Sequence, residues 1–213
     1  MLIIISSPSG GGKSTMCKKL MNDERSPLYE RAVFSISATT RKIRASEVDG
    51  VDYFFLTREE FEVKIRNNEF LEHATVFDNL YGTPTFGISK EKHTIFDIDY
   101  QGQVQIKSKA ECLSIFLIPP SIDALQKRIY NRGDIMPADL EKRVLKAPTE
   151  IENAINYDYI VLNDNIEQAF LDVCGIIKSA LLASKFCDFK NGSADFSGKF
   201  QDIINFAKNN LIF

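Results

Sequence analysis

Ten residues near the amino terminus have the types and spacing of a phosphate-binding site. Residues 6–15 read SSPSGGGKST and follow an apolar run at 2–5. Glycines let backbone N–H groups curl around phosphate oxygens because they carry no Cβ. The positive end of a following helix faces the same anion. Lys13 would reach the β- and γ-phosphates of a nucleotide, and the Ser14 hydroxyl would bind Mg²⁺. The stretch therefore predicts a strand, a phosphate-binding loop and a helix.

One residue of this stretch departs from the usual motif. Ser7 stands where the motif has its first glycine. The alternative interpretation is a glycine-rich turn that merely joins a buried strand to a helix. Gly12, Lys13 and Ser14 are intact, which favours the nucleotide site. A nucleotide site says little about a second substrate, so the discriminating residues must lie elsewhere in the chain.

A second set of anion-binding residue types lies further along the chain. Hydroxyl and guanidinium groups are the usual donors to a dianionic monophosphate. The set consists of Ser37, Arg41, Arg44, Tyr53 and Tyr81. Each alone is more often a solvated or packing side chain, so the prediction of a monophosphate site rests on the whole set.

Two acidic residues and a threonine suit the recognition of a base: Glu72, Asp99 and Thr83. Guanine presents N1–H and its 2-amino group as adjacent donors, so one carboxylate accepts both. Adenine offers an acceptor at N1, which would leave Glu72 facing a lone pair. Such a mismatch costs roughly 10²-fold or more in selectivity. These residues therefore predict recognition of guanine.

Length and composition define the class of protein. A chain of 213 residues with 44% apolar and 26% charged residues suits one α/β domain with embedded subdomains, or two small domains. A net charge of −3 gives no general attraction to nucleic acid or membranes. The four cysteines are widely spaced, as is typical of reduced thiols. The apolar run at 2–5 is too short for a signal peptide or membrane span. We therefore expect a cytoplasmic protein without nucleic-acid or membrane partners.

Hydrophobic periodicity predicts strands that alternate with helices. Strands are expected at 2–5, 33–36, 53–56, 70–77 paired with 80–81, 94–98, 113–118 and 159–162. Helices are expected at 14–21, from the capping box of Thr57 and Glu60 to Arg66, after the N-cap Ser121, from about 138, and at 167–186. This alternation predicts an α/β fold with a mostly parallel sheet covered on both faces.

The alternation breaks after the second strand, which predicts an inserted domain. A polar, basic loop is expected at 37–44, followed by short strands and turns up to about 89. We therefore expect a core domain made of residues 1–36 and 91–186, an insert at 37–90, and a short lid at about 131–142. The tail at 187–213 contains an amphipathic segment, is expected to be helical and has no assigned function.

In eight separate strings the chain resembles guanylate kinases. The strings are residues 8–14, 37–44, 47–55, 69–74, 79–83, 97–102, 119–121 and 163–164. The resemblance extends from about residue 2 to 184. It implies the three-layer P-loop fold, with an inserted α+β GMP-binding domain and a short lid. It also implies transfer of the γ-phosphoryl group of ATP to GMP, giving ADP and GDP, with Mg²⁺ as cofactor.

The resemblance implies a role for each matching residue. ATP would be bound by Ser9, Gly10, Gly11, Gly12, Lys13, Ser14, Thr15 and, near the adenine, Asn163. The phosphate of GMP would be bound by Ser37, Arg41, Arg44, Tyr53 and Tyr81, and its guanine by Glu72, Thr83 and Asp99. The catalytic set would be Lys13, Arg41, Arg128, Arg132 and Arg143. Mg²⁺ would be bound by Ser14, with Asp97 orienting its water shell. The alternative for the three arginines on the later helices is a set of solvated charges.

Two segments depart from the family pattern. The segment between Thr83 and Asp97 is about four residues shorter than is usual in the family, and Pro84, Thr85 and Gly87 weaken the helix that the family has there. That helix supports the guanine end of the site, so the expected contacts of Thr83 depend on it. Pro148 lies inside the helix expected after the lid, where a proline should kink or end it.

Two other functions are compatible with parts of the sequence. Some guanylate-kinase-like domains bind protein partners without catalysis, but they typically have a degraded phosphate-binding loop. Another nucleoside monophosphate kinase would share the loop, but Glu72 and Asp99 favour guanine. The sequence also leaves a homo-oligomer open.

Overall fold

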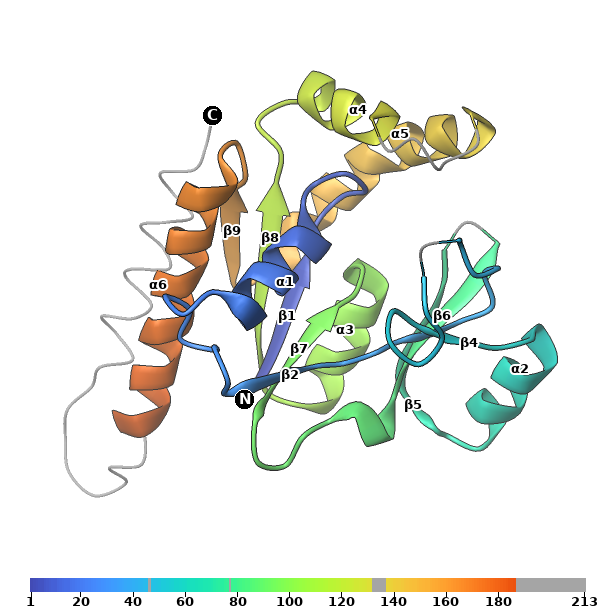
Figure 1. The fold of residues 1–213 in the computed structure, drawn as a ribbon, viewed down its shortest axis with the longest axis horizontal. Coiled ribbons are helices and arrows are strands. Elements are labelled where there is room, and N and C mark those ends of the chain that lie inside the picture. The colour runs from blue at the N-terminus through green and yellow to red at the C-terminus, as the bar shows by residue number, and fades with distance from the viewer. Residues whose placement is uncertain (46, 77, 132–136, 187–213) are drawn as a thin grey trace.

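A five-stranded parallel sheet forms the centre of the computed structural model, which describes residues 1–45, 47–76, 78–131 and 137–186 (Figure 1). The strand order is β2-β7-β1-β8-β9, and each neighbouring pair is parallel. The strands are β1 (Leu2–Ser6), β2 (Ala32–Phe34), β7 (His93–Asp97), β8 (Cys112–Ile118) and β9 (Tyr159–Leu162). The predicted α/β fold with a mostly parallel central sheet is confirmed.

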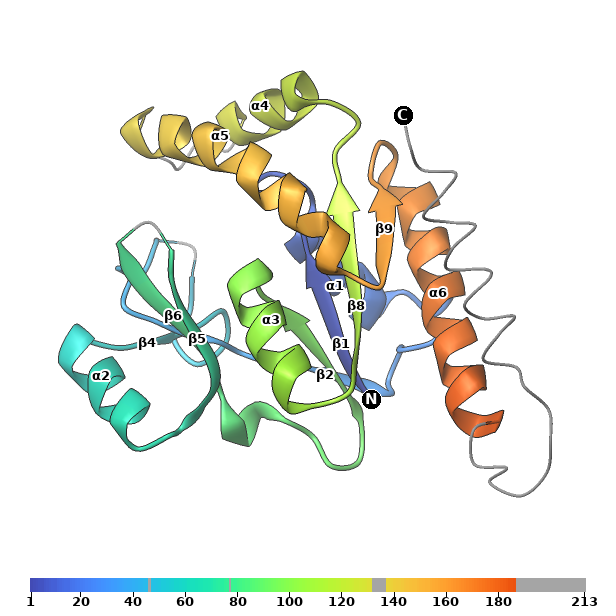
Figure 2. The same ribbon diagram turned by 180° about the vertical axis from the view of Figure 1, so that it is seen from behind.

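Helices cover both faces of this sheet, as Figures 1 and 2 show from opposite sides. Successive side chains of a strand point to opposite faces. Ile3 and Ile5 therefore pack in one layer with α1 (Lys13–Asn22) and α6 (Ile166–Phe186), whereas Ile4 packs in another with α3 (Tyr100–Lys109). Because both faces are buried, β1 is an unbroken apolar run rather than an alternating one.

A second, four-stranded sheet lies beside the central one and has the order β4-β3-β6-β5 (Figure 1). Its strands are β3 (Ala38–Thr39), β4 (Phe54–Phe55), β5 (Phe70–Val76) and β6 (Asn79–Pro84). The helix α2 (Arg58–Arg66) packs on it through the buried ring of Phe61, which stacks on Phe70. The predicted capping box is present, since Thr57 accepts from Glu60 N and Glu60 accepts from Thr57 N.

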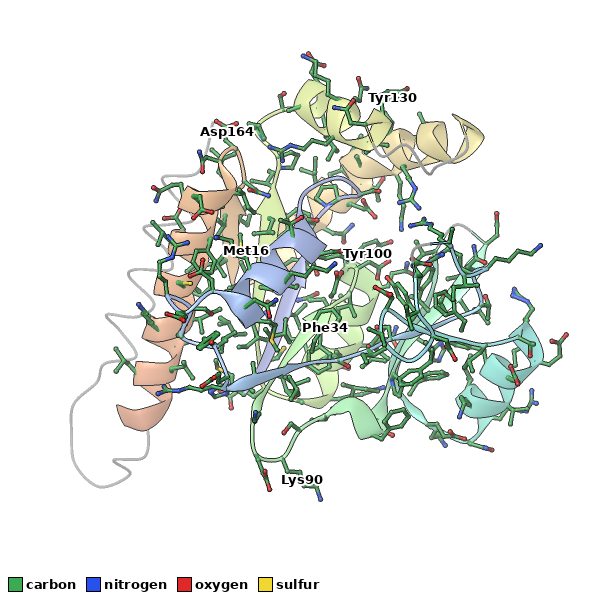
Figure 3. The ribbon with its side chains drawn as sticks, in the orientation of Figure 1. Met16, Phe34, Lys90, Tyr100, Tyr130 and Asp164 are labelled. Carbon is green, nitrogen blue, oxygen red and sulfur yellow. The ribbon has the colours of Figure 1, made fainter. Side chains whose placement is uncertain are left out.

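The remaining helices, α4 (Ile122–Tyr130) and α5 (Pro137–Glu152), lie at the carboxyl end of the parallel strands. The Ser121 hydroxyl caps α4, as expected, by accepting from Ala124 N. Figure 3 shows Tyr130 of α4 and Asp164, which follows β9, at this end of the molecule, and Lys90 at the opposite end. Of the expected lid, residues 132–136 lie outside the described residues. Arg132 and the tail at 187–213 also lie there.

One α-helix and one strand were not expected from the sequence, nor was the short 3₁₀ helix η2 (Asn153–Asn156). The helix α3 was missed because its buried residues are Gly102, Gln103 and Ile106, which give no apolar periodicity. The strand β3 lies inside the predicted loop at 37–44, so that prediction was wrong for Ala38 and Thr39. Both are buried and pair with β4 and β6.

The two segments that depart from the family pattern have different outcomes. After β6 the chain forms only the short 3₁₀ helix η1 (Thr85–Gly87), in line with the weak helix expected there. The helix α5, in contrast, continues through Pro148 to Glu152, so the proline does not end it. Pro148 is exposed, while Ala147 and Glu150 on the same helix are buried and hold it to the core. Within the described parts of the chain, none of the helices is long and apolar enough to span a bilayer.

Candidate active site

A cleft of about 690 Å³ opens at the carboxyl ends of β1 and β7. Parallel α/β sheets bind ligands at this end of their strands. The lining comes from both sheets and from the helices above them. It includes Lys13 of α1, Asp97 at the end of β7, Arg41 after β3, Glu72 of β5 and Arg143 of α5. Residues far apart in the sequence therefore meet in one cavity.

The loop between β1 and α1 forms the floor of one half of the cleft. Gly10 and Gly12 adopt φ angles of 84° and 96°, which favour glycine. A Cβ on Gly12 would lie 2.3 Å from Nδ2 of Asn163, and that nitrogen donates to the carbonyl of Gly11 at 2.7 Å. A Cβ on Gly11 would lie 2.7 Å from Cβ of Ser7. The serine at the first glycine position is therefore accommodated by a glycine that faces it.

Asp97 connects the first two residues of α1. Its Oδ1 lies 2.8 Å from Lys13 Nζ, and its Oδ2 accepts from the Ser14 hydroxyl at 2.9 Å. Burial alone would lower the pKa of Lys13, but the charge and hydrogen bond of Asp97 raise it above its usual range. The lysine therefore stays protonated. A hydroxyl and a carboxylate side by side are oxygen ligands that suit Mg²⁺, which prefers few protein ligands together with substrate phosphates.

Arg41 provides the main cation of the other half of the cleft. Its guanidinium donates to both carboxylate oxygens of Glu47, at 2.9 and 2.7 Å. Glu47 also accepts from the backbone N of Arg44 at 2.9 Å. The guanidinium carbon lies 5.4 Å from the ring centre of Tyr53 and 5.6 Å from that of Phe55. These contacts fix the orientation of the Arg41 guanidinium. The carboxylate of Glu47 occupies the edge of the guanidinium that can donate two parallel hydrogen bonds to an anion.

The phenol rings beside Arg41 complete this half. Tyr53 and Tyr81 contact each other edge to face, with ring centres 6.0 Å apart. Burial and the nearby Asp97 raise the pKa of Tyr53 to about 12, so its hydroxyl remains a donor. Arg44 and Ser37 also line the cleft. All five residues predicted to bind a monophosphate therefore lie around one part of the cavity.

Glu72 and Thr83 form a buried pair at the inner end of the cleft. The Thr83 hydroxyl donates to Glu72 Oε1 at 2.6 Å, and the two residues are 0% and 4% exposed, respectively. Burial, with the charge of Asp99 adding to it, raises the pKa of Glu72 to about 7. A Cβ on Gly102 would lie 2.6 Å from Glu72 Oε2, so the glycine makes room for this carboxyl group. The hydroxyl of Thr83 lies beneath the carboxyl, not at the cleft surface.

Asp99 caps α3 beside this pair. Its Oδ1 accepts from the backbone N of Gln101 and Gly102, and its Oδ2 accepts from the side chain of Gln101. Asp99 lines the cleft together with Glu72. The two predicted guanine-binding carboxylates therefore meet, and α3, the helix missed in the sequence, is what brings Asp99 to this position.

Among the predicted site residues, Arg128, Thr15 and Asn163 do not line the cleft, whereas Arg143 does. Arg128 donates to the carbonyls of Asn163 and Asp164, at 3.0 and 3.3 Å, and is not among the residues that line the cleft. Thr15 is exposed on α1. Asn163 is buried against the phosphate-binding loop, as described above. Arg143 reaches the loop and donates to the Ser9 hydroxyl at 2.8 Å. Arg132 lies outside the described residues.

Three residues at the site were not expected to act there: Glu47, Lys146 and Glu150. Glu47 lies in one of the family strings, but nothing in the sequence shows that it binds Arg41. Lys146 and Glu150 are four residues apart, a spacing that usually indicates an exposed ion pair on a helix. Glu150 lines the cleft, and Lys146 lies behind it, next to Glu150 and Asp99. This placement depends on how α5 packs, which the spacing does not reveal.

Comparisons with known proteins identify the family. The family model for guanylate kinase matches residues 1–180. A guanylate kinase of Clostridium perfringens is 44% identical over 190 residues, which cover 87% of this chain and 84% of that protein. A guanylate kinase of Clostridioides difficile is 40% identical over 196 residues, covering 90% and 92%.

A solved structure gives the same result. The crystal structure of guanylate kinase from Anaplasma phagocytophilum superimposes with a TM-score of 0.68 at 32% identity, covering 84% of this chain and 85% of that one. The sequence-based predictions of family and enzyme class are thus confirmed. The chain belongs to the guanylate kinase family, whose members are ATP:GMP phosphotransferases.

Proposed function

We propose that this protein transfers the γ-phosphoryl group of ATP to GMP in the cleft described above, giving ADP and GDP. The observation that carries the proposal is that one cavity contains both Lys13 of the phosphate-binding loop and the group of Arg41, Glu72 and Asp99. The first suits a triphosphate, and the second suits a guanine nucleotide monophosphate. Two anionic substrates therefore have separate binding regions that face each other.

In the donor half, the loop at 7–12 cradles the phosphates of ATP through its backbone N–H groups. Lys13 has three N–H donors, so it can keep Asp97 while it contacts the β- and γ-phosphates. Arg143 reaches this loop from α5 and adds positive charge where charge develops during transfer. We propose the same task for Arg128 and Arg132, with the adenine near Asn163.

Mg²⁺ fits the same half of the site. Ser14 Oγ and the Asp97 carboxylate would hold it, the latter through water. Held by these two residues, the ion would supply positive charge that neutralises part of the charge of the substrate phosphates. The hydrogen bond between Ser14 and Asp97 supports this role, because it brings the two oxygen ligands together.

In the acceptor half, Arg41 and Arg44 bind the phosphate of GMP together with the hydroxyls of Ser37, Tyr53 and Tyr81. The phosphate competes with Glu47 for the bidentate edge of Arg41, since both are anions with paired oxygens. Ionised Glu72 accepts from N1–H and the 2-amino group of guanine, and Asp99 adds a second acceptor. Thr83 orients Glu72 through its hydrogen bond.

Transfer needs no side-chain nucleophile. An oxygen of the GMP phosphate attacks the γ-phosphorus in line, and the surrounding cations stabilise the charge on the transferring group. Water must be excluded, because it would hydrolyse ATP instead. We propose that the insert at 37–90, which carries the acceptor site, closes toward the core formed by 1–36 and 91–186, with the lid at about 131–142.

The cellular compartment of the enzyme is a further part of the proposal. We propose a cytoplasmic enzyme acting on free ATP and GMP, with reduced thiols. Cys17, Cys112 and Cys174 are free, which supports this proposal. The intact arrangement of Lys13, Ser14 and Asp97 supports catalysis over a purely protein-binding role.

An assay of ADP release with different acceptors tests the function. Purified protein is mixed with millimolar Mg·ATP and GMP, AMP, dTMP or UMP. We expect turnover with GMP at least about 10²-fold above the others, because Glu72 faces paired donors only on guanine. Absence of turnover with all four would favour the protein-binding alternative. Faster turnover with another acceptor would identify a different monophosphate kinase.

A further inference from the structure

One face of α5 contacts both halves of the cleft. Arg143, Lys146 and Glu150 are three and four residues apart, which places them on the same face of a helix. Arg143 and Glu150 reach Ser9 of the phosphate-binding loop, the former at its hydroxyl and the latter at its backbone N. Lys146 reaches Asp99 at the opposite, guanine-facing side. The helix therefore spans the distance between the two predicted substrate sites.

Lys146 lies between two carboxylates. Its Nζ is 3.3 Å from Glu150 Oε1 and 3.7 Å from Asp99 Oδ2. The side chains of all three residues are at least three-quarters buried. Screening by water is weak at such burial, so the ammonium stabilises both negative charges more than it would at the surface.

Glu150 needs this cation. Its Oε2 accepts from Ser9 N at 3.3 Å, so a carboxylate stands against the loop that is proposed to bind phosphates. Burial raises the pKa of Glu150, and Lys146 and Lys13 act in the opposite direction. An uncompensated carboxylate here would repel the phosphates of ATP. With Lys146 beside it, the pair is neutral and still holds the loop backbone.

Asp99 depends on Lys146 in a different way. Its Oδ1 is committed to capping α3, while its Oδ2 has the side chain of Gln101 and the ammonium of Lys146 nearby. Lys146 therefore acts on Oδ2: it helps to fix the position of this oxygen and stabilises its negative charge. A carboxylate held in this way presents a fixed acceptor to the base.

We propose that Lys146 and Glu150 are positioning residues that connect the guanine-binding carboxylate Asp99 to the phosphate-binding loop. Neither touches the reacting atoms. Lys146 orients Asp99 for the acceptor, and Glu150 holds Ser9 on the donor side while it is neutralised by Lys146. This inference rests on the proposed function, because it assigns Asp99 to guanine and the loop to ATP.

Steady-state kinetics of Lys146→Met, Glu150→Gln and the double variant test the proposal. We expect Lys146→Met to raise KM for GMP about three- to tenfold, with kcat changed less than about twofold, since a partly buried ion pair is lost without loss of a reacting group. Its selectivity for GMP over IMP, which lacks the 2-amino group, should fall. Lys146→Arg should restore KM for GMP to within about twofold of the wild type, because it keeps the charge.

The double variant measures the energetic coupling between Lys146 and Glu150. Because Lys146 and Glu150 neutralise each other, their effects on KM for ATP should be less than additive when both are changed. Lys127→Met and Glu152→Gln are matched controls on exposed positions of α4 and α5. Both should keep wild-type constants, and circular dichroism should show that all variants are folded.

The proposal is overturned if Lys146→Met is folded and active but its KM for GMP and its selectivity against IMP equal those of Lys127→Met. Loss of thermal stability alone, with unchanged KM, would also overturn it, since that is what a merely structural ion pair predicts. Failure of the proposed function is a different result, because then the wild type itself does not phosphorylate GMP.

Discussion

The two halves of the cleft are organised in different ways. The donor half is one continuous loop whose backbone is fixed by Gly10, Gly12 and the hydrogen bond from Asn163. The acceptor half is assembled from side chains on several strands and loops, and its charged groups are held by other side chains. Glu47 occupies the fork of Arg41, and Thr83 occupies one oxygen of Glu72.

This difference has a consequence for binding. The donor loop has a backbone that is already fixed, so ATP, bound there as proposed, would require little rearrangement. In the proposed acceptor half, by contrast, Arg41 must exchange partners, because the phosphate of GMP would compete with Glu47 for its guanidinium. Under the proposed function, the affinity for GMP would therefore be the difference between the ion pair of Arg41 with the phosphate and its ion pair with Glu47, whereas the affinity for ATP would come largely from a preformed loop. Changes in the two halves should separate in KM and kcat.

The largest effect is expected in the donor half, from Lys13→Ala. We expect kcat to fall by roughly 10³-fold, because the variant lacks the ammonium that we propose stabilises the transferring phosphoryl group. Stability should fall by about 1–2 kcal/mol, since Asp97 loses a partly buried partner. Coupled kinetics and chemical denaturation measure the two quantities.

Lys90→Ala serves as the control for this variant, because Lys90 is exposed at the opposite end of the molecule (Figure 3). It should match the wild type. Near-normal turnover in Lys13→Ala would contradict the proposal that the phosphate-binding loop binds ATP. The distinction between a donor half and an acceptor half of the cleft would then be lost.

The same contrast explains what could be predicted from the sequence. The donor loop is contiguous, so its glycines, Lys13 and Ser14 are recognisable as one string, and the strand and helix beside it follow. The parallel sheet and α6 have strong apolar patterns and were predicted nearly to their ends. Ser121 and Thr57 mark helix starts through local hydrogen bonds, which local sequence encodes.

Features that depend on packing could not be predicted in the same way. The helix α3 buries a glycine and a glutamine, so its pattern is weak, although it positions Asp99. The contact of Arg128 with the carbonyls at 163 and 164 joins segments whose approach is set by tertiary structure. Arg41 and Glu47 are only six residues apart, but their pairing depends on the fold of an irregular loop, for which the sequence has no periodic signal. Pro148 was expected to kink or end α5, and it does not end it, because the helix continues to Glu152 with Ala147 and Glu150 buried beside the proline.

The second effect is expected in the acceptor half, from Arg41→Ala. We expect KM for GMP to rise by roughly 10²-fold, because the bidentate contact with the phosphate is lost. KM for ATP should change less than about twofold, since the donor loop is built separately. Arg58→Ala is the control, because Arg58 is an exposed arginine on α2, the helix that packs on the same sheet. An equal rise in both KM values would show that the halves are not independent.

The smallest of the three effects concerns pH and Glu72, whose pKa is raised to about 7 by burial. Guanine offers two donors, so under the proposed function the ionised carboxylate would be the form of Glu72 that binds it. Lowering the pH from 8 to 6 protonates most of it and should raise KM for GMP about five- to tenfold. The phosphate of GMP also titrates near pH 6. The same measurement on Glu72→Gln isolates the contribution of the carboxyl group. The variant should have a higher KM for GMP, and the part of the pH dependence that comes from titration of Glu72 should be absent.

Stability should change with pH in the opposite direction. The folded-state pKa of Glu72 lies above the unfolded value of 4.5, so its contribution to stability is fully present below pH 4.5 and is lost as the pH rises through about 7. At pH 8 the buried charge costs up to roughly 3 kcal/mol, and Glu72→Gln should be more stable than the wild type there but not at pH 5. Urea denaturation at both pH values measures this. The expectation fails if both the affinity of the wild type for GMP and its stability rise between pH 6 and pH 8. Glu72 would then carry no cost for its buried charge in the absence of GMP, and the acceptor half would be as preformed as the donor loop.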